Sequence, residues 1–261
     1  MQGFVLYNAP QSTCSQRVRY VLHVKNLAFE EHRLDLFAGD QLKPEYLTIN
    51  PNGVVPSLVH AGQAVTDSAV IMEYLEDIHP SSLRPSDAFG AAKMRAMMRF
   101  IDEVPTPAIR VPSYNLAFLP HYQTMTAKEF QDLCDAKPLR REFLMKMGRT
   151  GFPDQDMNEA LNRLRRGIQR MASWLSDNEG PWLMGGQMTL ADIAIMPVIV
   201  RMDDIGLASQ WSDSPAIQSW LDAIRRTDAF TKAYYHGSLL TEKYPHLQTE
   251  RKGLPIVGSD V

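Results

Sequence analysis

The most constraining feature of this 261-residue sequence is the order of apolar patterns in its first 80 residues. The predicted elements are strands at 3–7 and 29–36, a helix at 15–24, a short helix or turn at 42–50, a hairpin at 54–68 and a helix at 68–80. A strand, a crossover helix and a second strand favour parallel pairing, whereas hairpin strands pair antiparallel. We therefore expect an α/β unit built on a mixed four-stranded sheet.

The character of the sequence changes after residue 80. The connector "PSSLRPSDAFG" (80–90) is rich in Pro, Ser and Gly, which makes it the best candidate for a boundary. Helical spacing then predicts long helices at 91–104, 156–176, 190–205 and 215–226, with proline-interrupted short helices and loop at 105–153. We expect an α/β domain at 1–80, a linker at 81–90, an all-α domain at 91–245 and a polar tail at 246–261.

Composition removes several classes of function. A net charge of −3 and a pI near 6.2 give no electrostatic reason to expect nucleic acid. The apolar runs fall short of the roughly 18 residues that a membrane span needs, and the first residues lack signal-peptide features. Two cysteines are too few for a disulfide framework, and no zinc, iron or phosphate-loop motif is present. We expect a cytoplasmic globular protein without partners among nucleic acids or membranes.

Three motifs spread over both halves resemble the glutathione transferase family. They are "NPNGVVPSL" (50–58), "TDSAVIMEYLED" (66–77) and "GGQMTLADIAI" (185–195). The resemblance implies a thioredoxin-like N-terminal domain, a helical-bundle C-terminal domain and glutathione as cosubstrate. In the third motif it implies a structural role only, with Thr189 capping a helix and Asp192 reaching back.

The first two motifs carry the residues assigned to glutathione. In the family a cis proline, here Pro56, follows the residue that pairs with the glutathione backbone, here Val55. The resemblance also places Asp67 and Ser68 at the glutamyl end. Helix N–H groups there can bind a carboxylate, with help from Ser68, or Asp67 can pair with the ammonium group. The plainer alternative is that Asp67 and Ser68 form an ordinary N-cap pair.

Two further segments resemble two different subgroups of the family. The turn "STCSQRVRYVL" (12–22) resembles the zeta class, whereas the extra segment 127–157 resembles bacterial β-etherases of lignin-fragment catabolism, particularly the β(S)-aryl ether cleaving type. Those etherases usually have Asn-Ser in the turn, where this chain has Cys14-Ser15. The zeta resemblance makes Ser12 the thiolate donor, and the etherase resemblance makes Ser15, with Cys14, face the sulfur.

The chemistry of this turn fits the activation of a thiol. A free thiol with a pKa of about 8.5 is mostly protonated at neutral pH, yet the thiolate is the nucleophile. Hydroxyl or thiol donors and the N-terminus of a helix both stabilise a thiolate. Ser12, Thr13, Cys14 and Ser15 supply both. We expect Ser12 or Ser15 to activate the glutathione thiol, with Cys14 third, the alternative being that Ser12 or Thr13 only caps the helix.

The candidate residues for binding the second substrate are aromatic and lie in a segment that we expect to be a loop. They are Tyr114, Phe118, His121 and Tyr122. Such residues suit an aromatic substrate, although core or interface packing explains them equally well. Arg140 and Arg141 are expected on a solvated face.

The combined resemblance implies glutathione-dependent cleavage of β-aryl ethers, in which the thiolate displaces a phenol and leaves a glutathione thioether. The alternatives are a zeta-type maleylacetoacetate isomerase or dehalogenase, and a binding or heterodimer subunit without its own turnover. The resemblance also implies a dimer, either of identical chains or with a related chain.

Overall fold

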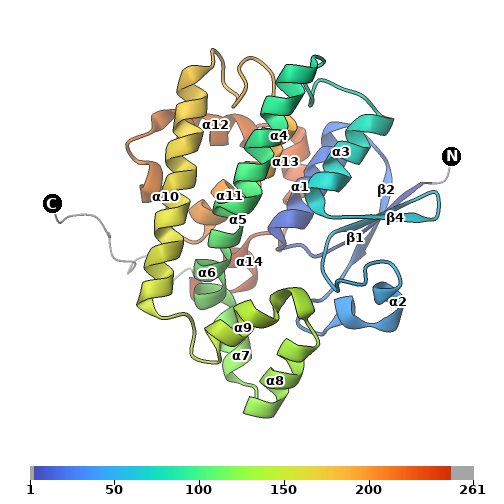
Figure 1. Cartoon of the computed structure of the whole chain (residues 1–261), viewed down its shortest axis with the longest axis vertical. Coiled ribbons are helices and arrows are strands. Elements are labelled where there is room, and N and C mark those ends of the chain that lie inside the picture. The colour runs from blue at the N-terminus through green and yellow to red at the C-terminus, as the bar shows by residue number, and fades with distance from the viewer. Residues whose placement is uncertain (1–2, 248–261) are drawn as a thin grey trace.

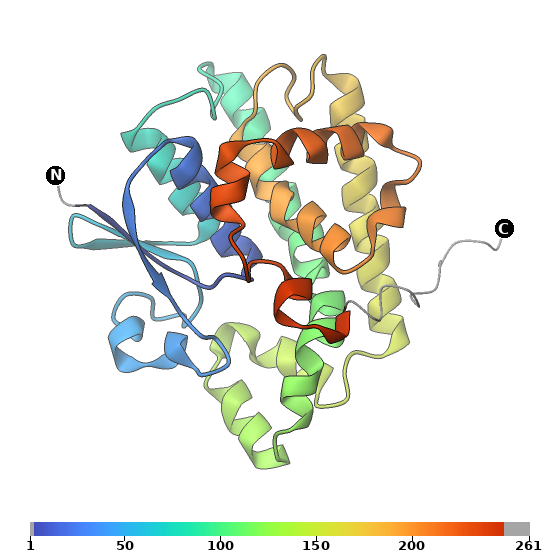
Figure 2. The ribbon, with the colours of Figure 1, turned by 180° about the vertical axis from the view of Figure 1, so that it is seen from behind.

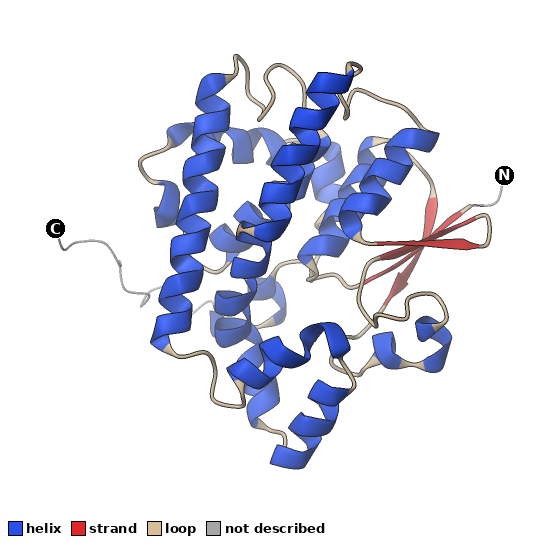
Figure 3. Ribbon diagram, in the orientation of Figure 1, coloured by secondary structure: helices blue, strands red, loops and turns tan. Residues whose placement is uncertain are grey.

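The computed structural model describes residues 3–247, so the predicted tail at 246–261 lies, from residue 248 on, outside the described residues. Its strands gather on one side of the molecule, and helices make up the rest (Figure 3). Strands β1 (Phe4–Asn8), β2 (Phe29–Arg33), β3 (Ser57–His60) and β4 (Gln63–Thr66) form one sheet in the order β2-β1-β3-β4. β1 and β2 are parallel, while β3 is antiparallel to β1 and β4. The predicted mixed four-stranded sheet is confirmed.

Three helices accompany the sheet: α1 (Thr13–Val24), α2 (Pro44–Leu47) and α3 (Ser68–Ile78). α1 packs against α3, and both bury apolar residues at helical spacing, such as Val18 and Leu22 in α1. The hairpin between β3 and β4 turns at Ala61 and Gly62, whose φ angles of 52° and 77° are those of a two-residue turn with a left-handed backbone.

The rest of the described chain is helical (Figure 1). The helices are α4 (Ala88–Glu103), α5 (Pro105–Ala108), α6 (Arg110–Ser113), α7 (Leu119–Gln123), α8 (Ala127–Asp135), α9 (Arg141–Met147), α10 (Asp154–Asp177), α11 (Leu190–Asp204), α12 (Pro215–Arg225), α13 (Asp228–Ala233) and α14 (Leu240–Lys243). The four long helices predicted from spacing are confirmed to within a few residues at each end.

Helix α11 forms the centre of the helical half. It contacts α1, α4 and α12, so nearly all its residues are buried. Its start is fixed as the third motif predicted, because the Asp192 carboxylate accepts from the Thr189 N–H at 2.9 Å. The same carboxylate accepts from the Leu183 N–H and the Trp220 indole N–H, each at 2.9 Å. The cap therefore also ties α11 to α12.

The segment from α5 to α9 contains less loop than predicted. The aromatic residues expected in a loop lie in a π-helical turn (η2, Tyr114–Phe118) and in α7. The prolines mislead because they occupy the first turns of short helices, where a missing N–H costs nothing. Helices α8 and α9 form what we call the α8–α9 insert (residues 126–152). A small core of its own comprises Phe130, Cys134, Leu144, Met147 and Phe152, with Tyr122 of α7 packed into it.

Two halves with different architecture are joined by a buried arginine. Arg17 lies in α1, and its side chain is only 2% exposed. Its guanidinium donates to the Ala194 carbonyl at 2.8 Å, the Asp102 carboxylate at 2.6 Å and the Thr106 hydroxyl at 2.8 Å. The helical half therefore supplies the hydrogen-bond acceptors that allow this charge to be buried.

Candidate active site

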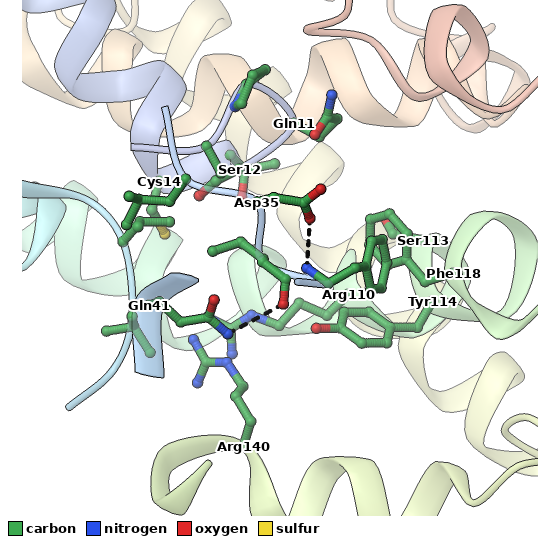
Figure 4. Close-up of a pocket in the computed structure, with 18 of the residues that line it drawn as sticks. Gln11, Ser12, Cys14, Asp35, Gln41, Arg110, Ser113, Tyr114, Phe118 and Arg140 are labelled. Carbon is green, nitrogen blue, oxygen red and sulfur yellow. Dashed lines mark hydrogen bonds between the residues drawn. The ribbon is translucent and has the colours of Figure 1, made fainter. Parts of the chain in front are cut away.

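A cavity of about 380 Å³ lies between the sheet side and the helical half. Its walls come from the β1–α1 turn, the chain after β2, the segment before β3, helices α6 and α7, the α8–α9 insert and α14. The start of α1, with Ser12 and Cys14, lies on one side of it, and aromatic residues such as Tyr114 and Phe118 lie on the other (Figure 4). This division suits a polar ligand next to an apolar one.

The β1–α1 turn presents Ser12, Thr13 and Cys14 to the cavity. Ser12 is the N-cap of α1, and its Oγ accepts from the Ser15 N–H at 3.2 Å. A hydroxyl that accepts at its oxygen still has its own proton to donate. The capping role and a role in binding an anion are therefore compatible at Ser12.

Ser15 lies elsewhere. Its side chain is fully buried, and its Oγ accepts from the Ala9 N–H at 3.3 Å rather than lining the cavity. Cys14 is a free cysteine that does line the cavity. Of the three predicted catalytic residues, the structure therefore brings Ser12 and Cys14 to the site and holds Ser15 behind it.

Buried arginines fix the shape of this turn. Arg19, which is 0% exposed, donates to the Asn8 amide oxygen at 2.6 Å, to the Pro10 carbonyl at 2.9 Å and to the Ala233 carbonyl at 2.9 Å. Arg201 in α11 donates to the Gln11 carbonyl. The turn therefore takes its conformation from contacts with the helical half, which sequence spacing does not reveal.

The segment before β3 has the features expected for binding a peptide. The Val55–Pro56 bond is cis, and Val55 borders the cavity. Among residues 3–247, no hydrogen bond engages the N–H or C=O of Val55. Nearby, the buried Gln41 amide donates to the Leu36 carbonyl, but its Oε1 has no partner within the described chain. A ligand with amide groups, such as glutathione, fits these groups.

Asp67 and Ser68 stand apart from the cavity walls just described. Asp67 has a φ of 71° and caps α3, its carboxylate accepting from the N–H groups of Ala69 at 2.9 Å and Val70 at 3.1 Å. Ser68 is buried, and its hydroxyl accepts from Arg17 at 3.3 Å. The Asp67 side chain itself is exposed, so a cationic group could still approach it.

Aromatic side chains form the opposite wall. Tyr114, Phe118 and Tyr122 all line the cavity, and Tyr114 lies edge-on to Phe118 with centroids 4.9 Å apart. The ring of Tyr244, the residue after α14, lies with its centroid 5.6 Å from that of Phe118, so the end of the described chain completes this wall. In Figure 2 the last described helix, in red, lies beside the green helices of this region. His121 is the exception, since it does not line the cavity but packs behind Phe37 at 4.2 Å.

The sequence analysis missed a set of basic residues on the same wall. Arg110, Lys137 and Arg140 line the cavity, so the expectation that Arg140 lies on a solvated face is wrong. In Figure 4 Arg140 reaches from the insert toward Gln41. Arg141 is half exposed and pairs with Asp135 at 2.7 Å, as expected of a surface residue. Helical spacing alone does not distinguish these neighbouring arginines.

The described residues also bear on metal binding and on membrane insertion. Among residues 3–247 no group of His, Cys, Asp and Glu side chains could hold a metal ion. In the same range, every helix is too short or too polar to cross a membrane.

Residues 11–78 match the N-terminal domain, and residues 158–223 the C-terminal domain, of the glutathione S-transferase family. Glutathione S-transferase 1 of Dianthus caryophyllus is 30% identical over 88% of this chain and 90% of its own length. Protein LigF of Sphingobium sp. is 28% identical over 88% of this chain and 92% of its own. A probable maleylacetoacetate isomerase of Caenorhabditis elegans is also 28% identical, over 88% of this chain and 92% of its own.

Solved structures agree with these matches. The crystal structure of β-etherase LigF has a TM-score of 0.79 at 27% identity and covers 88% of this chain and 98% of that one. Glutathione transferase F7 of Populus trichocarpa has a TM-score of 0.67 at 27% identity, covering 88% and 97%. Val55 and Gln41, the cavity residues that fit a tripeptide, lie in the segment that matches the N-terminal domain of a family whose members bind glutathione. This chain belongs to the glutathione S-transferase family.

Proposed function

We propose that this protein cleaves β-aryl ethers with glutathione, releasing a phenol and forming a glutathione thioether. The observation that carries the proposal is the cavity itself, in which the start of α1 and Ser12 face an aromatic wall built by η2 and α7, with leucines of the α8–α9 insert beside it. Support comes from the likeness to the β-etherase LigF, which extends over 88% of the chain with a TM-score of 0.79.

The reaction is a nucleophilic substitution. The glutathione thiolate attacks the β-carbon next to a ketone, a carbon–sulfur bond forms, and the carbon–oxygen bond breaks with its electron pair leaving on the aryloxide. The aryloxide then takes up a proton and becomes the phenol. Much of the rate gain in such a step comes from holding the two reactants in line at contact distance.

The N-terminus of α1 stabilises the thiolate in this proposal. The Ser12 hydroxyl donates a hydrogen bond to the sulfur, and the N-terminal end of the twelve-residue helix adds its partial positive charge. A hydrogen bond to a charged group contributes about 1.5–3 kcal/mol. At about 1.4 kcal/mol per pKa unit, that lowers the pKa of the bound thiol by roughly one to two units.

Other residues bind the rest of glutathione and the aryl ether in this proposal. The backbone of Val55 pairs with the cysteinyl part of glutathione, and Gln41 Oε1 accepts a hydrogen bond from the peptide. Asp67 receives the ammonium group at the glutamyl end. Tyr114, Phe118 and Tyr122 hold the aromatic rings of the ether.

A zeta-type isomerase or dehalogenase is the second candidate. The turn "STCSQRVR" and the likeness to the probable maleylacetoacetate isomerase of Caenorhabditis elegans favour it. In that reaction glutathione adds to a cis double bond and leaves after rotation, or displaces a halide. A cytoplasmic dimer, of one chain or of two related chains, belongs to the proposal in either case.

The test is glutathione-dependent release of a fluorescent phenol from a racemic β-aryl ether ketone by the purified protein. The proposal expects release that needs glutathione and that stops near half conversion, because one enantiomer fits. The matching alcohol, which lacks the activating carbonyl, is the control and should release none. Glutathione binding without phenol release from any such ketone would overturn the proposal, and turnover of maleylacetone would then favour the isomerase.

A further inference from the structure

The cavity wall formed by α6 and the α8–α9 insert carries an uncompensated positive charge. Arg110, Lys137 and Arg140 line the cavity, and none of them forms an ion pair with any residue in 3–247. The cavity wall includes one carboxylate, that of Asp35, whose Oδ1 already accepts from the N–H groups of Phe37 at 2.9 Å and Ala38 at 3.2 Å. The wall therefore has cations without an anion to match them.

Two buried arginines of α1 are compensated. Arg17 pairs with Asp102 at 2.6 Å and donates to three more acceptors. Arg19 donates to five acceptors from both halves. By contrast, no hydrogen bond from the Arg110 guanidinium occurs within the described chain, although the side chain is only partly exposed.

Leaving such charges unmatched costs free energy. Burial lowers the pKa of Arg110 and of Lys137, and the neighbouring Arg140 lowers that of Arg110 further. Both shifts have the direction expected of cations that lack an anionic partner. An anion that entered the cavity would be attracted by all three groups and would face little competition from the protein's own carboxylates.

The surroundings of the cluster indicate the kind of anion. Paired guanidinium groups match a planar carboxylate, to which each can donate in a fixed geometry. Tyr114, Phe118 and Leu144 line the same part of the cavity and offer an apolar surface. These neighbours fit an aromatic molecule that ends in a carboxylate.

The cluster comes from a part of the chain that neither domain of the family matches, although it shares the cavity with Gln41 and Val55. Arg110, Lys137 and Arg140 lie between residues 78 and 158, outside both segments that match the family's two domains. Val55, the predicted contact for glutathione, lies inside the N-terminal segment. We propose that the electrophilic substrate carries a carboxylate, which Arg110, Lys137 and Arg140 bind at the end of the aromatic wall.

This inference rests on the proposed function only for the ether part of the substrate. A second source of a carboxylate is the glycine end of glutathione itself, and the experiment has to separate the two. Two product-like ligands do so: S-(4-carboxybenzyl)glutathione and its carboxamide, S-(4-carbamoylbenzyl)glutathione. They share every atom of glutathione and differ in one charged group, and their binding needs no turnover.

Isothermal titration calorimetry of the full chain gives the ratio of the two dissociation constants. For the unchanged protein we expect the carboxylate to bind at least about tenfold more tightly than the amide, which corresponds to about 1.4 kcal/mol. Arg140→Gln should reduce this preference several-fold and leave the amide affinity nearly unchanged. Lys137→Gln is a second variant with the same expectation.

Arg141→Gln is the matched control, because Arg141 is the next residue but lies on the surface paired with Asp135. It should keep the full preference for the carboxylate. An unchanged protein that binds both ligands equally would overturn the proposal. So would an Arg140→Gln variant that weakens both ligands by the same factor, since the cluster would then bind the glycine carboxylate of glutathione. Failure to cleave ethers would overturn the proposed function without altering this ratio.

Discussion

At the scale of single residues, Ser12 combines two tasks in one hydroxyl. Its oxygen caps α1 by accepting from the Ser15 N–H, while its proton stays available to the cavity. We predict that Ser12→Ala raises the pKa of bound glutathione by about one to two units and destabilises the fold by about 1 kcal/mol through the lost cap. Ultraviolet absorbance of the thiolate against pH measures the first effect, and urea unfolding measures the second.

Ser15→Ala separates these effects because Ser15 accepts a hydrogen bond from the Ala9 N–H and does not line the cavity. It should leave the pKa of the bound thiol unchanged. If Ser15→Ala raised that pKa and Ser12→Ala did not, the assignment of the thiolate donor would have to move to the etherase-like alternative.

Arg19 is expected to contribute mainly to the stability of the fold rather than to catalysis. Removing it leaves buried carbonyl groups of the β1–α1 turn and of Ala233 without a donor, each at about 1–3 kcal/mol. Arg19→Met should therefore lower the free energy of unfolding by about 3 kcal/mol or more. Arg166→Met, at an exposed position in α10, should change it by less than about 0.5 kcal/mol. Equal urea midpoints for the two variants would contradict the structural role of Arg19.

Lys137 makes the preference for a carboxylate depend on pH. Burial lowers its pKa, so it loses its proton at a lower pH than a solvated lysine and the preference falls as the pH rises through that value. Of the groups that interact with Lys137, Cys134 has a pKa raised by burial, and His121, whose pKa burial lowers, is already neutral at alkaline pH. Lys137→Arg should abolish the fall because arginine stays protonated. A fall of the same size in Lys137→Arg would exclude Lys137 as its origin.

At the scale of elements, the α8–α9 insert joins the substrate wall to its own core. Leu144 is 1% exposed and lines the cavity, whereas its neighbour Met145 is 41% exposed. We predict that Leu144→Ala costs about 2–5 kcal/mol, loosens the insert and raises KM for the electrophile more than for glutathione. Met145→Ala should change little.

Amide hydrogen exchange locates this effect within the fold. In Leu144→Ala, amides of α8 and α9 should exchange faster while those of β1 and β3 keep their protection. Faster exchange of the sheet as well, or none in the insert, would show that the insert does not behave as a separate packing unit.

The elements also show what the sequence could predict. Regular periodicity placed β1, α1 and the four long helices, because each buries one face or is buried all round. It failed between α5 and α9, where prolines in first turns resemble breaks and a π-helical turn shifts the spacing. Arg140 and Arg141 were indistinguishable in sequence, since only the packing of the insert decides which of them enters the cavity.

At the scale of the whole molecule, the site exists only where the two halves meet. The sheet side supplies the start of α1 and the backbone of Val55, while the helical half supplies the aromatic and basic walls. Family motifs predicted the contribution of the sheet side, because those motifs lie in short local segments of the sequence. The contacts of Arg17 and Arg19 with residues far along the chain could not be predicted from any such segment.

The balance of products tests the central claim most directly. When the protein acts on a β-aryl ether ketone, mass spectrometry should find one glutathione thioether for each phenol released, with one glutathione consumed. Equal amounts of the three would establish that the thiol bound beside Ser12 displaces the aryloxide. Phenol formed without thioether, or glutathione left unconsumed while the substrate changes, would contradict displacement by the glutathione thiolate.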